Sequence, residues 1–200
     1  MDIPKHYIDK VKSRNRYSYF KGLIARGILY IKYRFAIYVA RRNGAKVGDS
    51  VAISIGFARR CNRFVSIGDH TSINTKYVTK ILAPLNIGSN VIINEDVKII
   101  MGSHKLDSEN FEVFKPNEGL TIGDYVWLCP GACITAGVKN IGAGAVVGTC
   151  SVVYADLKPM DIAMGNPART LSHREVLHTN VLAEELVGGD FRSYVKARNM

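Results

Sequence analysis

Cysteine is scarce in this chain of 200 residues: there are four, and their spacing fits neither a disulfide framework nor a zinc motif. We interpret them as small buried residues in a reducing compartment. The first residues are charged and no apolar run follows them, so the sequence predicts no secretory signal and a cytoplasmic location. With 22% charged and 47% hydrophobic residues, the composition excludes gross disorder and a collagen-like fold.

Acidic residues are nearly absent from the first quarter of the chain. Residues 1–46 hold 12 Lys and Arg against 2 acidic residues, whereas residues 47–200 hold 15 of each sign. Eight of the 18 aromatic residues also lie in this first quarter. Such a stretch fits a helical region that packs on the main domain, or peripheral attachment to the anionic inner face of a membrane. Nucleic-acid binding is disfavoured because no recognition motif accompanies the charge, so we expect no nucleic-acid partner.

Residues 23–40 are long enough to span a bilayer, but spanning is not expected. Arg26, Lys32 and Arg34 lie within this stretch, and each would cost roughly 2.5–3.5 kcal/mol at mid-membrane. Treated as one helix, the stretch has cations all around its circumference and thus no clean amphipathic face. Gly22 and Gly27 are points at which the helix could divide.

Helix-type periodicity ends near residue 45, and a six-residue repeat replaces it. In the clearest repeats an aliphatic residue is followed by glycine, with a small or β-branched residue four positions on. The repeats begin at Val47, Ile67, Ile87, Ile93, Ile122, Leu128, Ile134, Ile141 and Val147. A sandwich would space its strands every 8–12 residues. The shorter period predicts an all-β coil of short strands, in which each turn buries its aliphatic side chains by stacking on its neighbours.

This pattern resembles the hexapeptide-repeat acyltransferases, whose fold is a left-handed parallel β-helix. The resemblance covers about residues 45–169 and is strongest over 122–169, which end in Met-Gly-Asn-Pro-Ala-Arg. It is closest to the O-acetyltransferases of polysaccharide assembly and to the maltose and galactoside acetyltransferases. The resemblance implies a homotrimer with acetyl-CoA, the acyl donor, in the groove between subunits. The sequence departs from the family by one extra residue between Ile134 and Ile141, and by Tyr-Ala-Asp at 154–156 where many relatives have Thr-Lys-Asp.

Three parts are therefore predicted. Residues 1–44 form a basic, aromatic-rich helical region, residues 45–169 form the β-helix acyltransferase domain, and residues 170–200 form a short helical tail. The repeat is interrupted by a polar loop at 105–121. A long excursion from a regular scaffold is usually functional, and the resemblance implies that this loop overhangs the active site.

His104 stands in a Gly-Ser-His step directly before the loop. The family places its catalytic histidine at such a step, so the resemblance implies that His104 is a general base. It would remove the proton of an acceptor hydroxyl as that hydroxyl attacks the thioester carbonyl. The alternative is that His104 has only a structural role, at a corner between two strands of the coil. We interpret His70, in Ile-Gly-Asp-His, as an exposed turn residue.

Further site residues are implied by the same resemblance. Asn74 has the spacing to His104 of the family's catalytic-site asparagine, which positions the reacting groups; the alternative is a corner residue with positive φ. Trp127 would line the CoA or acceptor cleft, or else pack at the trimer seam. Arg169 would bind the nucleotide phosphates, or else be a solvated cation. Backbone groups along the pantetheine are assigned to Gly131, Ala136, Gly148 and Thr149.

The implied function is acetyl-CoA-dependent O-acetylation of a sugar hydroxyl, in a surface polysaccharide or its lipid-linked precursor. A close alternative is N-acetylation of an amino sugar or nucleotide-sugar, for which Asp107 and Glu109 are available to hold the ammonium group. A non-enzymatic trimeric scaffold is the third possibility. A zinc site of the carbonic-anhydrase kind is disfavoured because His70 and His104 lack a third histidine nearby, so we expect no metal.

Overall fold

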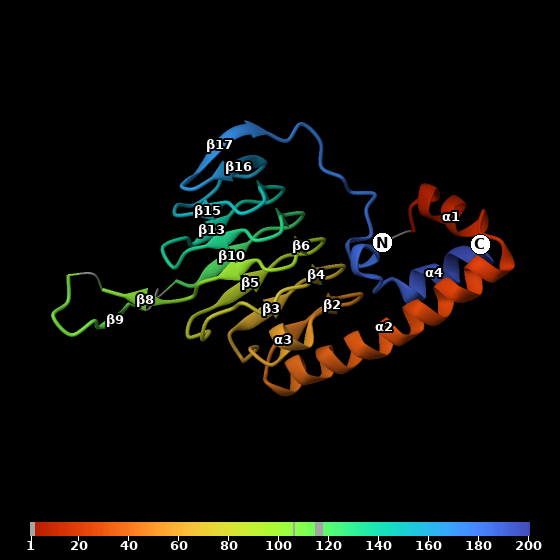
Figure 1. Ribbon diagram of the computed structural model, residues 1–200, viewed down its shortest axis with the longest axis horizontal. Helices are drawn as coiled ribbons and strands as arrows, with labels where there is room; N and C mark the ends of the chain where they lie inside the picture. The colour runs from red at the N-terminus through yellow and green to blue at the C-terminus, as the bar shows by residue number, and fades with distance from the viewer. Residues whose placement is uncertain (1–2, 106, 115–117) are drawn as a thin grey trace.

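The computed structural model describes residues 3–105, 107–114 and 118–200. Residues 106 and 115–117 of the predicted loop lie outside the described residues. Two helices, α1 (Lys5–Lys12) and α2 (Arg16–Arg42), precede a stack of short strands, and the C-terminal segment returns to those helices (Figure 1).

Three parallel sheets run along the stack, and each turn of the chain adds strands to them in order. The first sheet contains β1 (Lys46–Val47), β3 (Val65–Ile67), β5 (Leu85–Ile87), β10 (Leu120–Ile122) and β13 (Asn140–Ile141). The second contains β2 (Ala52–Ile53), β4 (Ser72–Ile73), β6 (Ile92–Ile93), β11 (Trp127–Leu128), β14 (Val146–Val147) and β16 (Asp161–Gly165). The third contains β7 (Lys98–Ile99), β12 (Cys133–Ile134) and β15 (Val152–Val153). The predicted parallel β-helix is confirmed.

The interior of the β-helix is a set of aliphatic ladders. In the second sheet Ile73 pairs with Ile93, and Ile93 pairs with Leu128 in the next turn. All three side chains are fully buried, and burying each of them stabilises the fold by about 1.5–3 kcal/mol. In the first turn a short helix, α3 (Ile55–Ala58), takes the place of a third-sheet strand.

The extra residue between Ile134 and Ile141 is accommodated by an aspartate of the next turn. Asp156 Oδ1 accepts hydrogen bonds from the backbone N–H groups of Lys139 at 2.7 Å and Asn140 at 3.0 Å. Asp156, the residue of the 154–156 segment that matches the family pattern, therefore supports this corner.

Left-handed backbone recurs at the corner between the first and second sheets. Ser50, His70, Asn90, Tyr125 and Gly144 occupy it with φ between 52° and 74°. The prediction that His70 is an exposed turn residue is half right. It does turn the corner, but its side chain is mostly buried, and its Nδ1 lies 3.3 Å from Oε1 of the buried Glu184.

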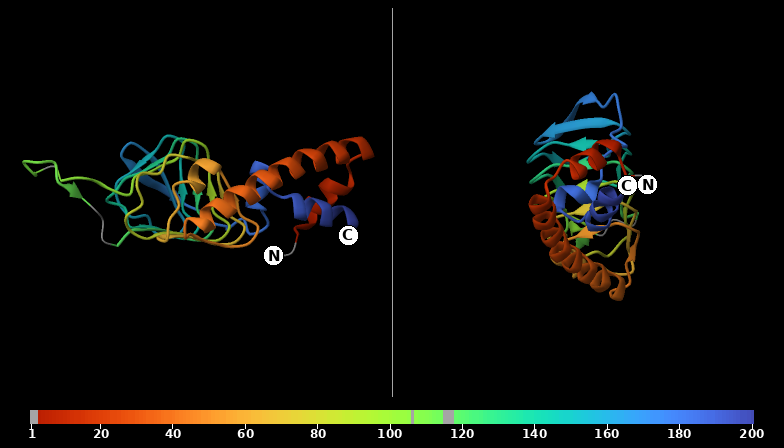
Figure 2. Two further views of the ribbon diagram at one scale, coloured as in Figure 1. Left: turned by 90° about the horizontal axis from the view of Figure 1, so that it is seen from below. Right: turned by 90° about the vertical axis from the view of Figure 1, so that its right-hand side faces the viewer.

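An antiparallel hairpin leaves the β-helix between β7 and β10. Its strands are β8 (Ser103–His104) and β9 (Val113–Phe114). It projects from the side opposite to the helices (Figures 1 and 2). The stack resumes in register afterwards, since Leu120 of β10 pairs with Leu85 of β5.

Helix α2 is one unbroken helix of 27 residues, about 40 Å long. Gly22 and Gly27 do not divide it. Gly22 instead lies so close to α4 (Phe191–Asn199) that a Cβ there would be 2.6 Å from Tyr194 Oη. The C-terminal end of α2 packs on α3 and the first turn, while its N-terminal half extends beyond the β-helix (Figures 1 and 2). Within the described residues, no helix combines the length and apolarity needed to cross a bilayer.

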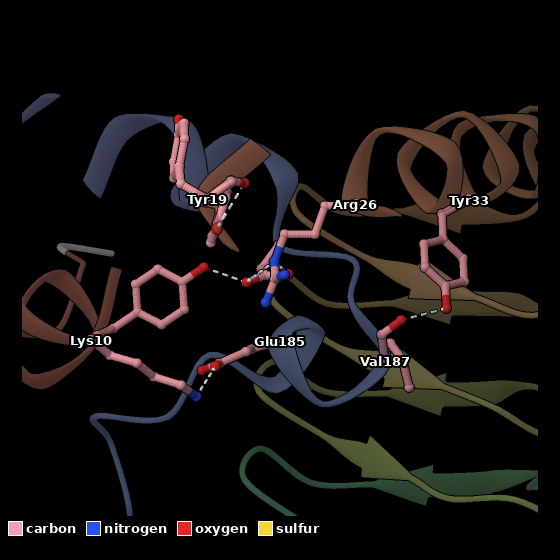
Figure 3. A network of polar contacts seen from close by, with 9 residues as sticks. Lys10, Tyr19, Arg26, Tyr33, Glu185 and Val187 are labelled. Atoms are coloured by element: carbon pink, nitrogen blue, oxygen red, sulfur yellow. Dashed lines mark hydrogen bonds and ion pairs between the residues drawn. The ribbon is translucent and has the colours of Figure 1, made fainter. Parts of the chain in front are cut away.

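The C-terminal segment closes the β-helix and then joins the helices. Strand β17 (Ala168–His173) pairs antiparallel with β16, and a 3-10 helix, η1 (Ala183–Val187), packs beside β4 before α4 begins. Figure 3 shows the polar network that holds this segment. Asp190 accepts hydrogen bonds from Tyr7 Oη and, at 2.9 Å, from Arg26 Nε. Burial, reinforced by the neighbouring Asp190 carboxylate, raises the pKa of Tyr7, so its hydroxyl stays protonated and donates.

Candidate active site

His104 is held by the hairpin in one tautomer. Its Nδ1 lies 2.5 Å from the carbonyl oxygen of Phe111, across the turn of the hairpin. A carbonyl can only accept, so in the neutral ring Nδ1 carries the proton and Nε2 presents a lone pair. The ring is exposed to solvent. A neutral imidazole with Nε2 as acceptor is the form that a general base requires.

The hairpin forms the walls of the cleft in which His104 lies. The cleft is lined by His104, Lys105, Asp107, Ser108, Glu109, Asn110 and Glu112. Lys105 Nζ pairs with Glu112 at 2.7 Å, and Ser108 Oγ accepts from the Glu112 N–H at 3.0 Å. These contacts tie the two arms of the hairpin together and so fix the Phe111 carbonyl against the imidazole.

Asn74 lies at the corner that follows β4, between the second and third sheets. Its backbone is not in the left-handed region, so the alternative of a positive-φ corner residue does not apply. The side-chain Nδ2 donates to Glu95 Oε1 at 3.1 Å. Asn74 therefore keeps its amide oxygen as an acceptor toward the cleft that it lines with Asn94 and Glu95.

Trp127 lies one turn above Asn94, on the second sheet. Its side chain is 42% exposed, and Nε1 donates to Asn94 Oδ1 at 3.1 Å. On its other side the indole lines a mainly apolar cleft of about 220 Å³ between the second sheet and the returning C-terminal segment, which contributes Arg174 and Leu186. Trp127 thus contacts Asn94 and Asn74 contacts Glu95, and these two partners are consecutive residues of the chain.

Asn94 and Glu95 were not predicted from the sequence. The repeat could have indicated them, because Ile73 and Ile93 begin equivalent repeats. Asn74 and Asn94, which follow them, must therefore lie on neighbouring turns. The backbone confirms this: Asn74 N–H donates to Ile93 and Asn94 N–H donates to Leu128.

Most of the predicted cofactor residues lie along this same corner, which we name the Asn74 edge. It is a row of equivalent positions on successive turns: Asn74, Asn94, Cys129 and Gly148, which directly follow second-sheet strands, and Met164, which lies within β16. Gly131 and Thr149 lie beside this row, and Arg169 pairs with Met164 at its upper end. Gly131 has φ of 73°, and a Cβ there would lie 3.0 Å from Cys150 Sγ. Four of the predicted cofactor residues, Gly131, Gly148, Thr149 and Arg169, therefore lie on or beside successive turns of one edge.

His104 and Ala136 lie at a different corner, between the third and first sheets, which we name the His104 edge. Ala136 follows β12 and is buried, and His104 follows β7 through β8. The third sheet separates this edge from the Asn74 edge. Within one chain the structure therefore does not bring His104 together with Asn74, Trp127 or Arg169.

Burial keeps three of the four cysteines in the thiol form. Cys61 is buried, and burial raises its pKa to about 12. Burial also raises the pKa values of Cys129 and Cys133. The prediction of buried cysteines is confirmed for Cys61 and Cys129, but Cys133 is only half-buried and Cys150 is exposed at a left-handed corner. In the part of the chain that the structure describes, no three His, Cys, Asp or Glu residues gather as a metal site.

Several known proteins share the sequence pattern and the fold. The chain is 28% identical over 144 residues to WcaF of Escherichia coli K12, named as a colanic acid biosynthesis acetyltransferase, with 72% of this chain and 78% of WcaF covered. A hexapeptide-repeat acetyltransferase of Vibrio cholerae is 26% identical and superposes with a TM-score of 0.61 over 84% of this chain and 92% of that chain. Its complex with acetyl coenzyme A superposes with a TM-score of 0.57, at 26% identity over 75% and 89% of the two chains. No protein-family model matches. These findings confirm the predicted resemblance to the hexapeptide-repeat acetyltransferases.

Proposed function

We propose that this chain, whose relatives and structural neighbours are hexapeptide-repeat acetyltransferases, transfers an acetyl group from acetyl-CoA to a sugar hydroxyl in surface-polysaccharide biosynthesis. The observation that carries the proposal is the hydrogen bond from His104 Nδ1 to the Phe111 carbonyl, because it leaves Nε2 as the base. The reaction would take place in the cytoplasm, where acetyl-CoA is available.

His104 acts twice in the proposed reaction. Its Nε2 takes the proton of the acceptor hydroxyl while the hydroxyl oxygen bonds to the thioester carbonyl carbon. When the carbon–sulfur bond then breaks, the imidazolium returns its proton to the departing CoA thiolate. The Phe111 carbonyl stabilises the imidazolium between these steps, since it accepts from Nδ1–H throughout. No covalent enzyme intermediate is formed, because the acceptor oxygen attacks the thioester directly.

The separation of the two edges supports a homotrimer with its sites between subunits. The His104 edge of one subunit would face the Asn74 edge of the next, and a ring of three closes this head-to-tail contact. Each cleft then holds His104 and Ala136 from one subunit and Asn74 from its neighbour. Asn74, oriented by Glu95, positions the reacting groups.

The donor would lie along the Asn74 edge, parallel to the axis of the β-helix. Successive turns are separated by about 4.8 Å, so backbone groups of Gly131, Gly148 and Thr149 follow one another along an extended pantetheine. Arg169 at the upper end suits the nucleotide phosphates, because a guanidinium binds phosphate with two parallel hydrogen bonds. Trp127 lines the cleft beside this row.

An amino sugar is a second candidate acceptor. Asp107 and Glu109 line the same cleft as His104, and a carboxylate there would bind the ammonium form of an amine. Amino sugars and neutral sugars therefore belong in the same acceptor panel.

The first experiment is thiol release from acetyl-CoA across a panel of sugars, amino sugars and lipid-linked oligosaccharides. His104→Ala should reduce turnover by about 10²- to 10⁴-fold, while acetyl-CoA still raises its melting temperature. His6→Ala, which changes an exposed histidine far from the hairpin, is the matched control and should retain full turnover. Full transfer by His104→Ala would disprove the assignment of the base. Absence of both turnover and a thermal shift in the wild type would instead favour a scaffold.

The trimeric arrangement is tested by mixing subunits. His104→Ala and Asn74→Ala are each expected to be inactive alone. If each cleft takes the two residues from different subunits, mixed trimers contain at least one cleft with both wild-type residues, and activity returns after denaturation and joint refolding. Sedimentation velocity should show three copies. Recovery would not occur if both residues act within one chain.

A further inference from the structure

Helix α2 carries a stripe of apolar side chains that face solvent. The stripe consists of Tyr17, Phe20, Ile24, Ile28, Ile31, Phe35 and Tyr38, each between 58% and 78% exposed. Their spacing of three or four residues places them on one side of the helix. At about 100° per residue they cover about 80° of its circumference. We name this surface the α2 stripe.

The α2 stripe lies opposite the side of the helix that packs on the protein. Gly22, Ala36, Ile37 and Ala40 are buried on that packed side. The expectation that α2 has no single amphipathic face is therefore confirmed. The helix has two apolar sides back to back, and together they hide the periodicity that either would show alone.

Cations border the α2 stripe on both sides. Helical spacing places Arg16, Arg34 and Arg41 along one border, and Lys21 and Lys32 along the other. All five are exposed. No acidic residue occurs between positions 16 and 42, so no carboxylate on α2 competes for these cations.

The residues of the stripe are also ordered along its length. Aromatic residues occupy both ends, with Tyr17 and Phe20 at one and Phe35 and Tyr38 at the other, while isoleucines fill the centre. The stripe is about 30 Å long. Aromatic rings at the ends and aliphatic side chains between them suit a helix that lies in the headgroup layer with its apolar side toward the acyl chains.

We propose that the α2 stripe binds an anionic lipid surface, with α2 lying in the plane of the membrane. A second copy of this chain is a poorer occupant, because two facing stripes would place Lys and Arg opposite Lys and Arg with no acid to pair. An anionic bilayer offers acyl chains for the isoleucines and phosphates for both borders. This inference stands on α2 alone and does not depend on the acetyl-transfer reaction.

The test is flotation of the full chain with vesicles of phosphatidylcholine alone and of phosphatidylcholine mixed equally with phosphatidylglycerol. Binding is expected to the anionic vesicles only, and to weaken with added salt. Lys21→Gln/Lys32→Gln should lower the partition coefficient roughly 25-fold, or about 5-fold per cation. The matched control is Lys80→Gln/Lys158→Gln, which removes two exposed cations from the β-helix and should bind as the wild type does.

The apolar part is tested separately with Ile24→Gln/Ile28→Gln, which keeps the charge and replaces β-branched residues with a better helix former. This variant should lose binding at least tenfold while circular dichroism shows the wild-type helix content. If that pair alters folding, Ile28→Gln alone serves, with a smaller loss. Unchanged flotation of the apolar variant would overturn the proposal. The proposal would also be overturned if the apolar variant changed its oligomeric state while it bound vesicles as the wild type does. That result would mean that the α2 stripe is covered by another copy of the chain.

Discussion

The β-helix and the helical lobe, formed by α1, α2 and α4, are held together by different chemistry. In the β-helix, aliphatic pairs such as Ile73 and Ile93 recur from turn to turn. The lobe has a small apolar cluster around Val11 and Tyr194, and adds to it a buried polar network in which Tyr7 reaches Asp190 across 183 positions of sequence. The first kind of contact is local and repeated, whereas the second is distant and occurs once. We therefore expect neighbouring turns of the β-helix to compensate in part when one buried side chain is removed. Removal of one group of the polar network should instead unfold the lobe as a unit.

The largest expected effect comes from removing the charge at the centre of the lobe. Asp190→Asn leaves the partly buried Arg26 guanidinium without its carboxylate, which should cost about 3–5 kcal/mol. Hydrogen exchange should rise in α1 and α4 and stay unchanged in the β-helix. Lys10→Ala, which breaks the exposed pair with Glu185, is the control and should cost no more than about 1 kcal/mol. Uniform loss of protection over the whole chain would mean that the two regions do not unfold separately.

A ladder residue should give a comparable loss in the other region. Leu128→Ala removes a fully buried side chain and should lower the free energy of unfolding by about 2–5 kcal/mol. Ile28→Ala on the α2 stripe deletes a side chain that is 64% exposed and should change it by no more than about 0.5 kcal/mol. Urea denaturation of both variants measures the difference. Equal losses would show that the stripe is covered in solution.

Two glycines of α2 should respond with opposite sign. At Gly22 a Cβ would lie 2.6 Å from Tyr194 Oη, so Gly22→Ala should destabilise the protein by about 1–3 kcal/mol. At Gly27 the nearest atom is 3.6 Å away, so Gly27→Ala should stabilise it by about 0.5–1 kcal/mol through helix propensity. Thermal unfolding of the pair is the measurement. Stabilisation by both would place α4 farther from α2 than the structure does.

A pH dependence should arise at Glu184, where the lobe meets the β-helix. Burial raises its pKa, an effect only partly opposed by His70. A carboxyl whose pKa is higher in the folded than in the unfolded chain stabilises the fold below its unfolded pKa, and this contribution is lost as pH rises through the folded pKa. Glu184→Gln cannot ionise, so its stability relative to the wild type should increase with pH. Parallel stability profiles of the two proteins would contradict this.

The same contrast determines what could be predicted from the sequence. The repeats that begin at Ile87, Ile122 and Ile141 stack in the first sheet as their spacing indicated. Asn74 and Gly148 could be assigned to turns for the same reason. The pairing of Arg26 with Asp190 could not be predicted, because no period links those positions. The α2 stripe was missed because a helix with two apolar sides has no single preferred face in its sequence.

The hairpin has a consequence for how such a protein changes over generations. Ile87 pairs with Ile122 in the same parallel register as Ile67 pairs with Ile87, although a hairpin is inserted between the first two and none between the second two. The corner after β7 therefore admits extra chain without shifting the strands on either side. An exchange of this segment between relatives would replace most of the cleft wall around the imidazole while the interior ladders stay as they are. New acceptor preferences could be acquired in this way by recombination at a single corner, without any compensating change in the scaffold.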